Sequence, residues 1–152
     1  MPLRAATRDA AIAIAAVLGV NGIVFGLGFS GTTDRAGEMT SVPGWLIGAV
    51  WTGLFALFGA AHGLLRALGP RTRTACHRLR WFGAFCLAYP FYTLGLSNQI
   101  IGLAGNAVTA IAALAVIRAA LRESRLAGAL ITPVLPWLGF ASWLSVYSWR
   151  SD

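Results

Sequence analysis

The stretch from Val42 to Gly63 reads VPGWLIGAVWTGLFALFGAAHG, and it decides the fold class of this chain. It carries no charged residue apart from one histidine, and it is long enough to cross a bilayer as an α-helix, which takes about 20 residues. Pro43 favours a helix start, and Trp45 is the kind of ring that lies at a membrane–water boundary. We therefore predict a transmembrane helix that begins near the membrane surface.

The two sides of this predicted helix differ in size. One side carries large side chains at helical spacing, namely Trp51, Phe55, Phe58 and His62. The other side carries small residues, namely Gly44, Gly48, Thr52, Gly59 and Gly63. Small residues let another backbone approach closely, so we expect one side to pack on a neighbouring helix and the other to line a flat apolar space. Helix packing alone is the simpler alternative.

Composition places the whole chain in the membrane class. The chain has 152 residues, of which 57% are hydrophobic and 11% charged, far from the averages of soluble proteins. Uncharged apolar stretches occur at residues 10–29, 45–65, 81–96, 100–117 and 126–146. The predicted fold is therefore an all-α membrane protein, a bundle of five transmembrane helices in a single domain that spans residues 1–152. No soluble catalytic domain remains outside these stretches.

The charges are distributed unevenly between the two sides of the predicted bundle. One side carries Arg4, Arg8, Arg66, Arg71, Arg73, Arg78, Arg80, Arg118, Arg122 and Arg125. The other side carries Arg35 and Arg150. By the positive-inside rule the N-terminus is cytoplasmic and the C-terminus extracytoplasmic. Arginines in short loops at helix ends are typical of contacts with lipid headgroups, so we expect membrane lipids as partners and no nucleic acid.

Prolines and basic loops are expected to shape the connections. Residues 69–80 and 118–125 are predicted to be basic loops, and residues 97–99 to join the third and fourth helices as a hairpin. Pro133 and Pro136 should disturb the first half of the fifth helix.

The first stretch is expected to be a retained helix, because 20 apolar residues exceed the core of a signal peptide. Within it, Asn21 requires a polar partner inside the bundle, and the pair Gly22 and Gly26 suggests close helix packing.

Nothing in the sequence has the spacing of a conventional catalytic or metal site. Cys76, in the predicted basic loop, and Cys86, in the third span, form no CxxC or CxxCH motif, which disfavours structural disulfides, zinc fingers and covalent haem attachment. The spans show no acid–base pair, metal cluster or nucleophile with its base. We therefore predict no catalytic residue and no metal ligand.

Three motifs make the chain resemble the TspO/MBR family, the tryptophan-rich sensory proteins whose animal members are called translocator protein or peripheral benzodiazepine receptor. The first is P-G-W followed by V-W-T and an aromatic residue, at Pro43, Gly44, Trp45, Val50, Trp51, Thr52 and Phe55. The second is Pro90, Phe91 and Tyr92 in the third span. The third is P-x-x-x-W-x-x-F-A-x-x-L, at Pro133, Trp137, Phe140, Ala141 and Leu144. Together they cover nearly the whole chain.

The resemblance implies a five-helix bundle of a bacterial cell membrane, commonly a homodimer, with an apolar pocket under its first loop. Such a pocket binds porphyrins, haem-like tetrapyrroles or sterol-like lipids, and the protein requires no cofactor. The ligand-binding residues that the resemblance implies here are Trp45, Trp51, Phe55, Tyr89, Phe91, Tyr92, Trp137, Phe140, Ala141 and Leu144. Arg35 in the first loop is the candidate cation for porphyrin propionates.

Three functions remain open at this point. The favoured one is a membrane module that binds such a ligand for sensing, sequestration or transport. The second is an enzyme that degrades porphyrin by oxidation or light, with Trp51 and Trp137 as its active groups, and the third is a structural membrane protein without a ligand. His62 lies about 25 Å along the helix from Trp45, whereas Trp51 lies about 9 Å from it, so we predict that no histidine binds the metal of a haem.

Overall fold

The computed structural model describes residues 2–27, 42–93 and 99–151, and these residues are helical apart from short connections. The helices are α1 (Pro2–Gly26), α2 (Gly44–Ala67), α3 (Arg73–Thr93), α4 (Gln99–Glu123), α5 (Arg125–Ile131) and α6 (Val134–Ser151), with a 3-10 turn, η2 (Pro70–Thr72), between α2 and α3. The predicted all-α class is confirmed for the described residues.

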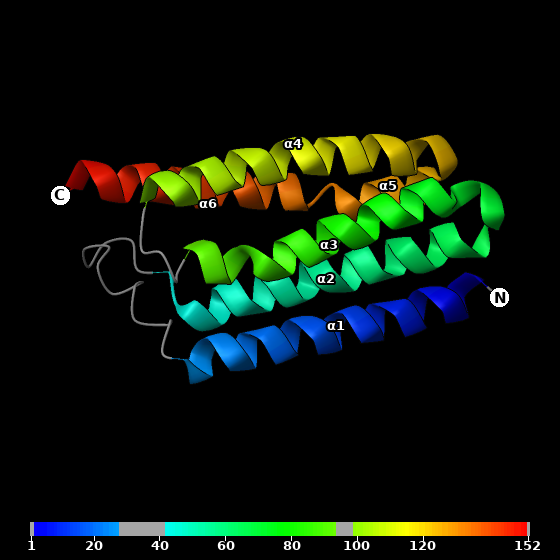
Figure 1. Ribbon diagram of the computed structural model, residues 1–152, viewed down its shortest axis with the longest axis horizontal. Helices are drawn as coiled ribbons and strands as arrows, with labels where there is room; N and C mark the ends of the chain where they lie inside the picture. The colour runs from blue at the N-terminus through cyan, green and yellow to red at the C-terminus, as the bar shows by residue number, and fades with distance from the viewer. Residues whose placement is uncertain (1, 28–41, 94–98, 152) are drawn as a thin grey trace.

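The helices lie side by side along the long axis, and α5 and α6 follow one another beside α4 (Figure 1). The central helix is α2, which packs against α1, α3 and α5, while α4 packs against α3, α5 and α6. The N-terminus, the α2–α3 connection and the α4–α5 connection share one end, and the C-terminus lies at the other (Figure 1). The first of these ends, called the basic end below, carries the described arginines that the sequence assigned to one side of the bundle.

Four segments of the described chain are long and apolar enough to cross a membrane, where the sequence predicted five. They are Pro2–Val24, Trp45–Ala67, Ile100–Glu123 and Arg125–Tyr147. The expected third span falls in α3, which does not have enough continuous apolar sequence because Arg73, Arg78 and Arg80 occupy its first turns. The helix nevertheless lies alongside the others over its full length (Figure 1).

The prediction of basic loops at residues 69–80 and 118–125 is wrong, because most of these residues are helical. After η2 the chain is helical from Arg73, and α4 continues to Glu123. Arginine is a good helix former, so a helix can extend past the apolar core into the headgroup layer without losing backbone hydrogen bonds. The chain leaves the helix only at Ser124, whose hydroxyl accepts a hydrogen bond from the N–H of Ala127 at 3.2 Å and caps α5.

The predicted disturbance by proline is confirmed in the fifth segment. Helix α5 ends at Ile131, two turn residues follow, and α6 begins at Val134 with Pro136 in its first turn. Pro133 has no backbone N–H and cannot donate the hydrogen bond that a helix needs at this position, so the helix breaks there. The backbone N–H of Leu135 donates instead to the carbonyl of Thr132 at 3.0 Å.

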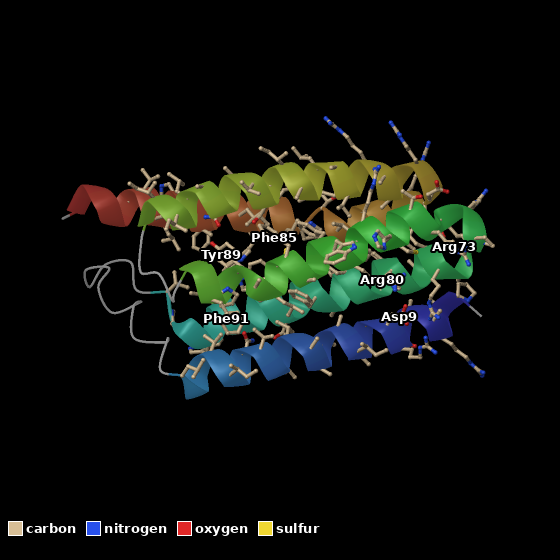
Figure 2. All side chains as sticks on the ribbon, in the orientation of Figure 1. Asp9, Arg73, Arg80, Phe85, Tyr89 and Phe91 are labelled. Carbon is tan, nitrogen blue, oxygen red and sulfur yellow. The ribbon has the colours of Figure 1, made fainter. Side chains whose placement is uncertain are left out.

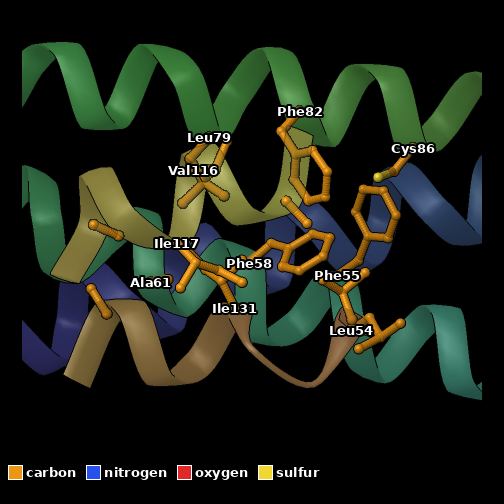
Figure 3. Close-up of a cluster of buried hydrophobic side chains, with 14 of the residues drawn as sticks. Leu54, Phe55, Phe58, Ala61, Leu79, Phe82, Cys86, Val116, Ile117 and Ile131 are labelled. Carbon is orange, nitrogen blue, oxygen red and sulfur yellow. The ribbon is translucent and has the colours of Figure 1, made fainter. Parts of the chain in front are cut away.

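The core lies between α2, α3, α4, α5 and α6, and Figure 3 shows part of it. Phe55 and Phe58 of α2 meet Phe82 of α3, and Ile117 of α4 and Ile131 of α5 belong to the same cluster. Both cysteines are free and buried in α3, so Cys76 lies in the core and not in the loop that the sequence predicted.

The predicted small edge of α2 is confirmed where α1 crosses it. A Cβ atom at Gly59 would lie 2.4 Å from the carbonyl oxygen of Asp9, and one at Gly63 would lie 2.4 Å from that of Ala5. The two backbones are therefore in direct contact. By contrast, Gly22 and Gly26 face away from the bundle, and the close packing expected of this pair is not found among the described residues.

Candidate functional site

A shallow groove of about 590 Å³ runs between α2 and the junction of α5 with α6. Its lining is apolar, and consists of Val50, Gly53, Leu54, Leu57, Pro133, Pro136, Trp137 and Phe140. Two features of the sequence make this space. Gly53 has no side chain to fill it, and Pro133 and Pro136 border it at the break between α5 and α6.

Aromatic rings continue from the groove along α6. The ring centroids are 5.7 Å apart for Trp137 and Phe140, 6.1 Å for Phe140 and Trp143, and 5.7 Å for Trp143 and Tyr147. The ring of Trp143 is more than half exposed, and Phe140 is also exposed. A strip of rings therefore leads from the groove toward the C-terminal end of the bundle.

A second set of rings lies inside the bundle on another face of α2. Trp51, which is only 8% exposed, has its ring centroid 5.6 Å from that of Tyr89 and 6.2 Å from that of Phe55. The contacts continue to Phe58 and from it to Phe82. This face lies about a third of a turn from the face that lines the groove.

Asn106 of α4 joins this internal cluster, and the sequence interpretation missed it. Its side chain is 2% exposed, and its Oδ1 accepts a hydrogen bond from the hydroxyl of Tyr89. Its Nδ2 is buried with no hydrogen-bond partner among the described residues. The sequence feature that could have identified Asn106 is one strongly polar side chain in a span made mostly of alanine, isoleucine, leucine and valine. The same feature identified Asn21 in the first span.

The structure divides the predicted binding residues into three groups. Trp137 and Phe140 line the groove, while Trp51, Phe55 and Tyr89 form the internal cluster. The remaining described ones are dispersed, with Trp45 and Phe91 exposed and Ala141 and Leu144 half-buried on α6. Arg35 and the side chain of Tyr92 lie outside the described part of the structure. Trp51 and Trp137 belong to one hydrophobic core, but Trp51 does not line the groove.

A polar cluster joins α1 to α2 near the basic end. Nδ1 of His62 lies 2.8 Å from Oδ2 of Asp9, so the ring donates to the carboxylate. Arg66 donates to both carboxylate oxygens, from Nε at 3.2 Å and from Nη2 at 3.0 Å. Asp9 is 8% exposed, and a carboxylate is tolerated at such a site only when it is paired in this way. The sequence interpretation missed Asp9 because it began the first span one residue later.

Neither histidine faces the groove. His62 is held by Asp9, and Nε2 of His77 accepts a hydrogen bond from the indole N–H of Trp81 at 2.8 Å on the exposed side of α3. No group of three or more histidine, cysteine, aspartate or glutamate side chains that could hold a metal ion occurs in the described part of the chain. That no histidine binds a haem metal stays a prediction.

Comparison with known proteins identifies the family. No curated protein matches the chain. The family model of the TspO/MBR family matches residues 10–150, which is nearly the whole chain and includes all four apolar segments for most of their length. This protein is therefore an integral, multi-pass membrane protein that belongs to the TspO/MBR family.

Proposed function

We propose that this protein binds a flat, largely apolar ligand, a porphyrin, a haem-like tetrapyrrole or a sterol-like lipid, in the groove between α2 and α6. The observation that carries the proposal is the groove itself, in which Trp137 and Phe140 stand opposite Gly53 with no charged side chain in the lining. Its volume of about 590 Å³ is within the usual range of small-molecule sites. Binding would serve sensing, sequestration or transport and requires no cofactor.

The shape of the groove suits a planar molecule. An indole, a phenyl ring and two prolines offer flat surfaces, and each stacked ring pair adds about 0.5–1.5 kcal/mol beyond the burial of area. A porphyrin also carries propionates, for which the groove lining holds no cation. We assign that role to Arg35 of the first loop, because the family resemblance implies a pocket under that loop.

The same proposal includes the arrangement in the membrane. We infer five spans, with α3 as the span whose basic first turns reach the headgroups, in a bacterial cell membrane. Because the arginines gather at the end that holds the N-terminus, we place that end in the cytoplasm and the C-terminus outside. We further propose a homodimer, which the outward-facing small residues Gly19, Gly22 and Gly26 of α1 support.

The test is the absorbance spectrum of the purified protein with protoporphyrin, in the dark and under light. A red-shifted Soret band that saturates and persists in light supports binding. Gly53→Leu should abolish it by filling the groove, while Gly102→Leu on α4, where a side chain also meets no neighbouring atom within 4 Å, should leave it unchanged. Light-dependent bleaching to a product would instead favour the enzyme, and no shift in the parent would refute ligand binding.

A further inference from the structure

A second cavity, of about 570 Å³, lies between α1, α2 and α3 toward the basic end of the bundle. It shares no lining residue with the groove between α2 and α6. Helix α2 lies between α1 and α3 (Figure 1), so it forms the floor of this cavity, and the other two helices form its sides. Ile12 on α1 and Ala84 on α3 line the cavity and are also exposed. The cavity therefore opens sideways, toward the acyl chains of a bilayer.

The lining changes from charged to apolar in the same direction on all three helices. The charged level holds Arg8 on α1, Arg66 on α2 and Arg80 on α3. About one to three turns farther from the basic end, the lining consists of Ile12, Ala13, Ala16, Phe55, Phe58, Ala84 and Leu87. The cavity thus has a cationic end at the level of the headgroups and an apolar end within the hydrocarbon.

The cationic end has an excess of positive charge. Arg66 and Arg8 share the single carboxylate of Asp9, at 3.0 Å and 3.4 Å. Arg80 forms no ion pair with any residue in the described part of the structure. Figure 2 shows Arg80 and Asp9 toward the same end of the bundle. This end of the cavity is therefore lined by three guanidinium groups, which stay charged at any physiological pH, and by one carboxylate.

We propose that this cavity binds one anionic phospholipid from the leaflet at the basic end. The phosphate lies against Arg8 and Arg80. One guanidinium group can donate two parallel hydrogen bonds to the oxygens of a phosphate, and it loses its water more easily than an ammonium group does. One acyl chain runs along Phe55 and Phe58 toward the middle of the bilayer. The sideways opening selects a phospholipid over a free acid, because the second acyl chain can stay in the bilayer while the first occupies the cavity.

The experiment uses full-length protein, stripped of lipid in detergent and then given equal amounts of phosphatidylglycerol and phosphatidylcholine with identical acyl chains. Native mass spectrometry counts the lipids that remain bound. We expect one retained phosphatidylglycerol and a preference over phosphatidylcholine of about tenfold, the size expected of a charge-assisted hydrogen bond.

Two variants separate the charged end from the apolar end. Arg80→Gln should remove most of the preference, and Ala84→Leu should displace the acyl chain while leaving every charge in place. Both residues are exposed, so neither change disturbs the core. The matched controls are Arg118→Gln and Ala115→Leu on α4, which are exposed and outside the cavity and should bind as the parent does.

Three results would overturn the proposal. One is equal retention by the parent and both cavity variants, and another is an equal loss in Arg118→Gln, which would indicate general attraction of anionic lipid to the basic end. The third is displacement of phosphatidylglycerol by an equal concentration of oleate in the parent, which would make a single-chain acid the occupant.

Discussion

The contact between the backbones of α1 and α2 makes Gly63→Ala a sensitive test of the fold. The added Cβ would lie 2.4 Å from the carbonyl oxygen of Ala5 and 2.6 Å from Cα of Ala6, whereas ordinary contacts begin at 3.4 Å. The obstacle is backbone, which cannot rotate away, so α1 must withdraw by about 1 Å. Overpacking of this kind lowers the free energy of unfolding by about 1–3 kcal/mol. The higher helix propensity of alanine relative to glycine offsets up to about 1 kcal/mol of this loss. Withdrawal also lengthens the hydrogen bonds of Asp9 to His62 and Arg66.

We expect a net loss of about 2 kcal/mol, which for a chain of this size lowers Tm by about 4–8 °C. The two free cysteines, Cys76 and Cys86, supply the assay, because both are buried and react with a thiol-specific fluorophore only as the bundle unfolds. Gly53→Ala is the control, since a Cβ there meets no neighbouring atom within 4 Å and should leave Tm unchanged or slightly higher. If the two variants melt together, α1 does not cross α2 at this glycine edge.

Three further predictions concern topology and ligand binding. A C-terminal fusion to alkaline phosphatase should be active and a fusion to a fluorescent protein dark, and the reverse pattern would overturn either the span count or the orientation. Trp137→Phe and Trp51→Phe should both weaken porphyrin binding, and Trp137→Phe should do so more strongly because, of the two, only Trp137 lines the groove. The control is Trp81→Phe on the exposed side of α3, which should bind porphyrin normally in the same titration. His62→Ala should keep the Soret shifts of both haem and metal-free porphyrin, and loss of the haem shift alone would show that His62 binds the iron.

Much of the helical architecture could be predicted from the residues alone. The bilayer offers no hydrogen bonds to the backbone, so long apolar stretches have to be helical wherever they cross it. Pro133 breaks the fifth segment for a reason equally local, its missing N–H. Helix ends were predicted less well, because charge marks the membrane surface and not the end of a helix, and α3 and α4 continue through their arginines.

Which faces meet was decided by the tertiary structure. In lipid, the outside of a helix is as apolar as its inside, so the contrast that identifies the buried face of a soluble helix is weak. Asp9 and His62 are 53 residues apart in the chain and meet only because two glycines let α1 reach the backbone of α2. Trp51 and Trp137 were both predicted to line one pocket, yet only Trp137 borders the groove. The sequence by itself determined that the chain forms membrane helices with aromatic rings at these positions. Packing between helices decided which rings and charges share a cavity, because this depends on where two helices cross, and no single stretch of sequence encodes that.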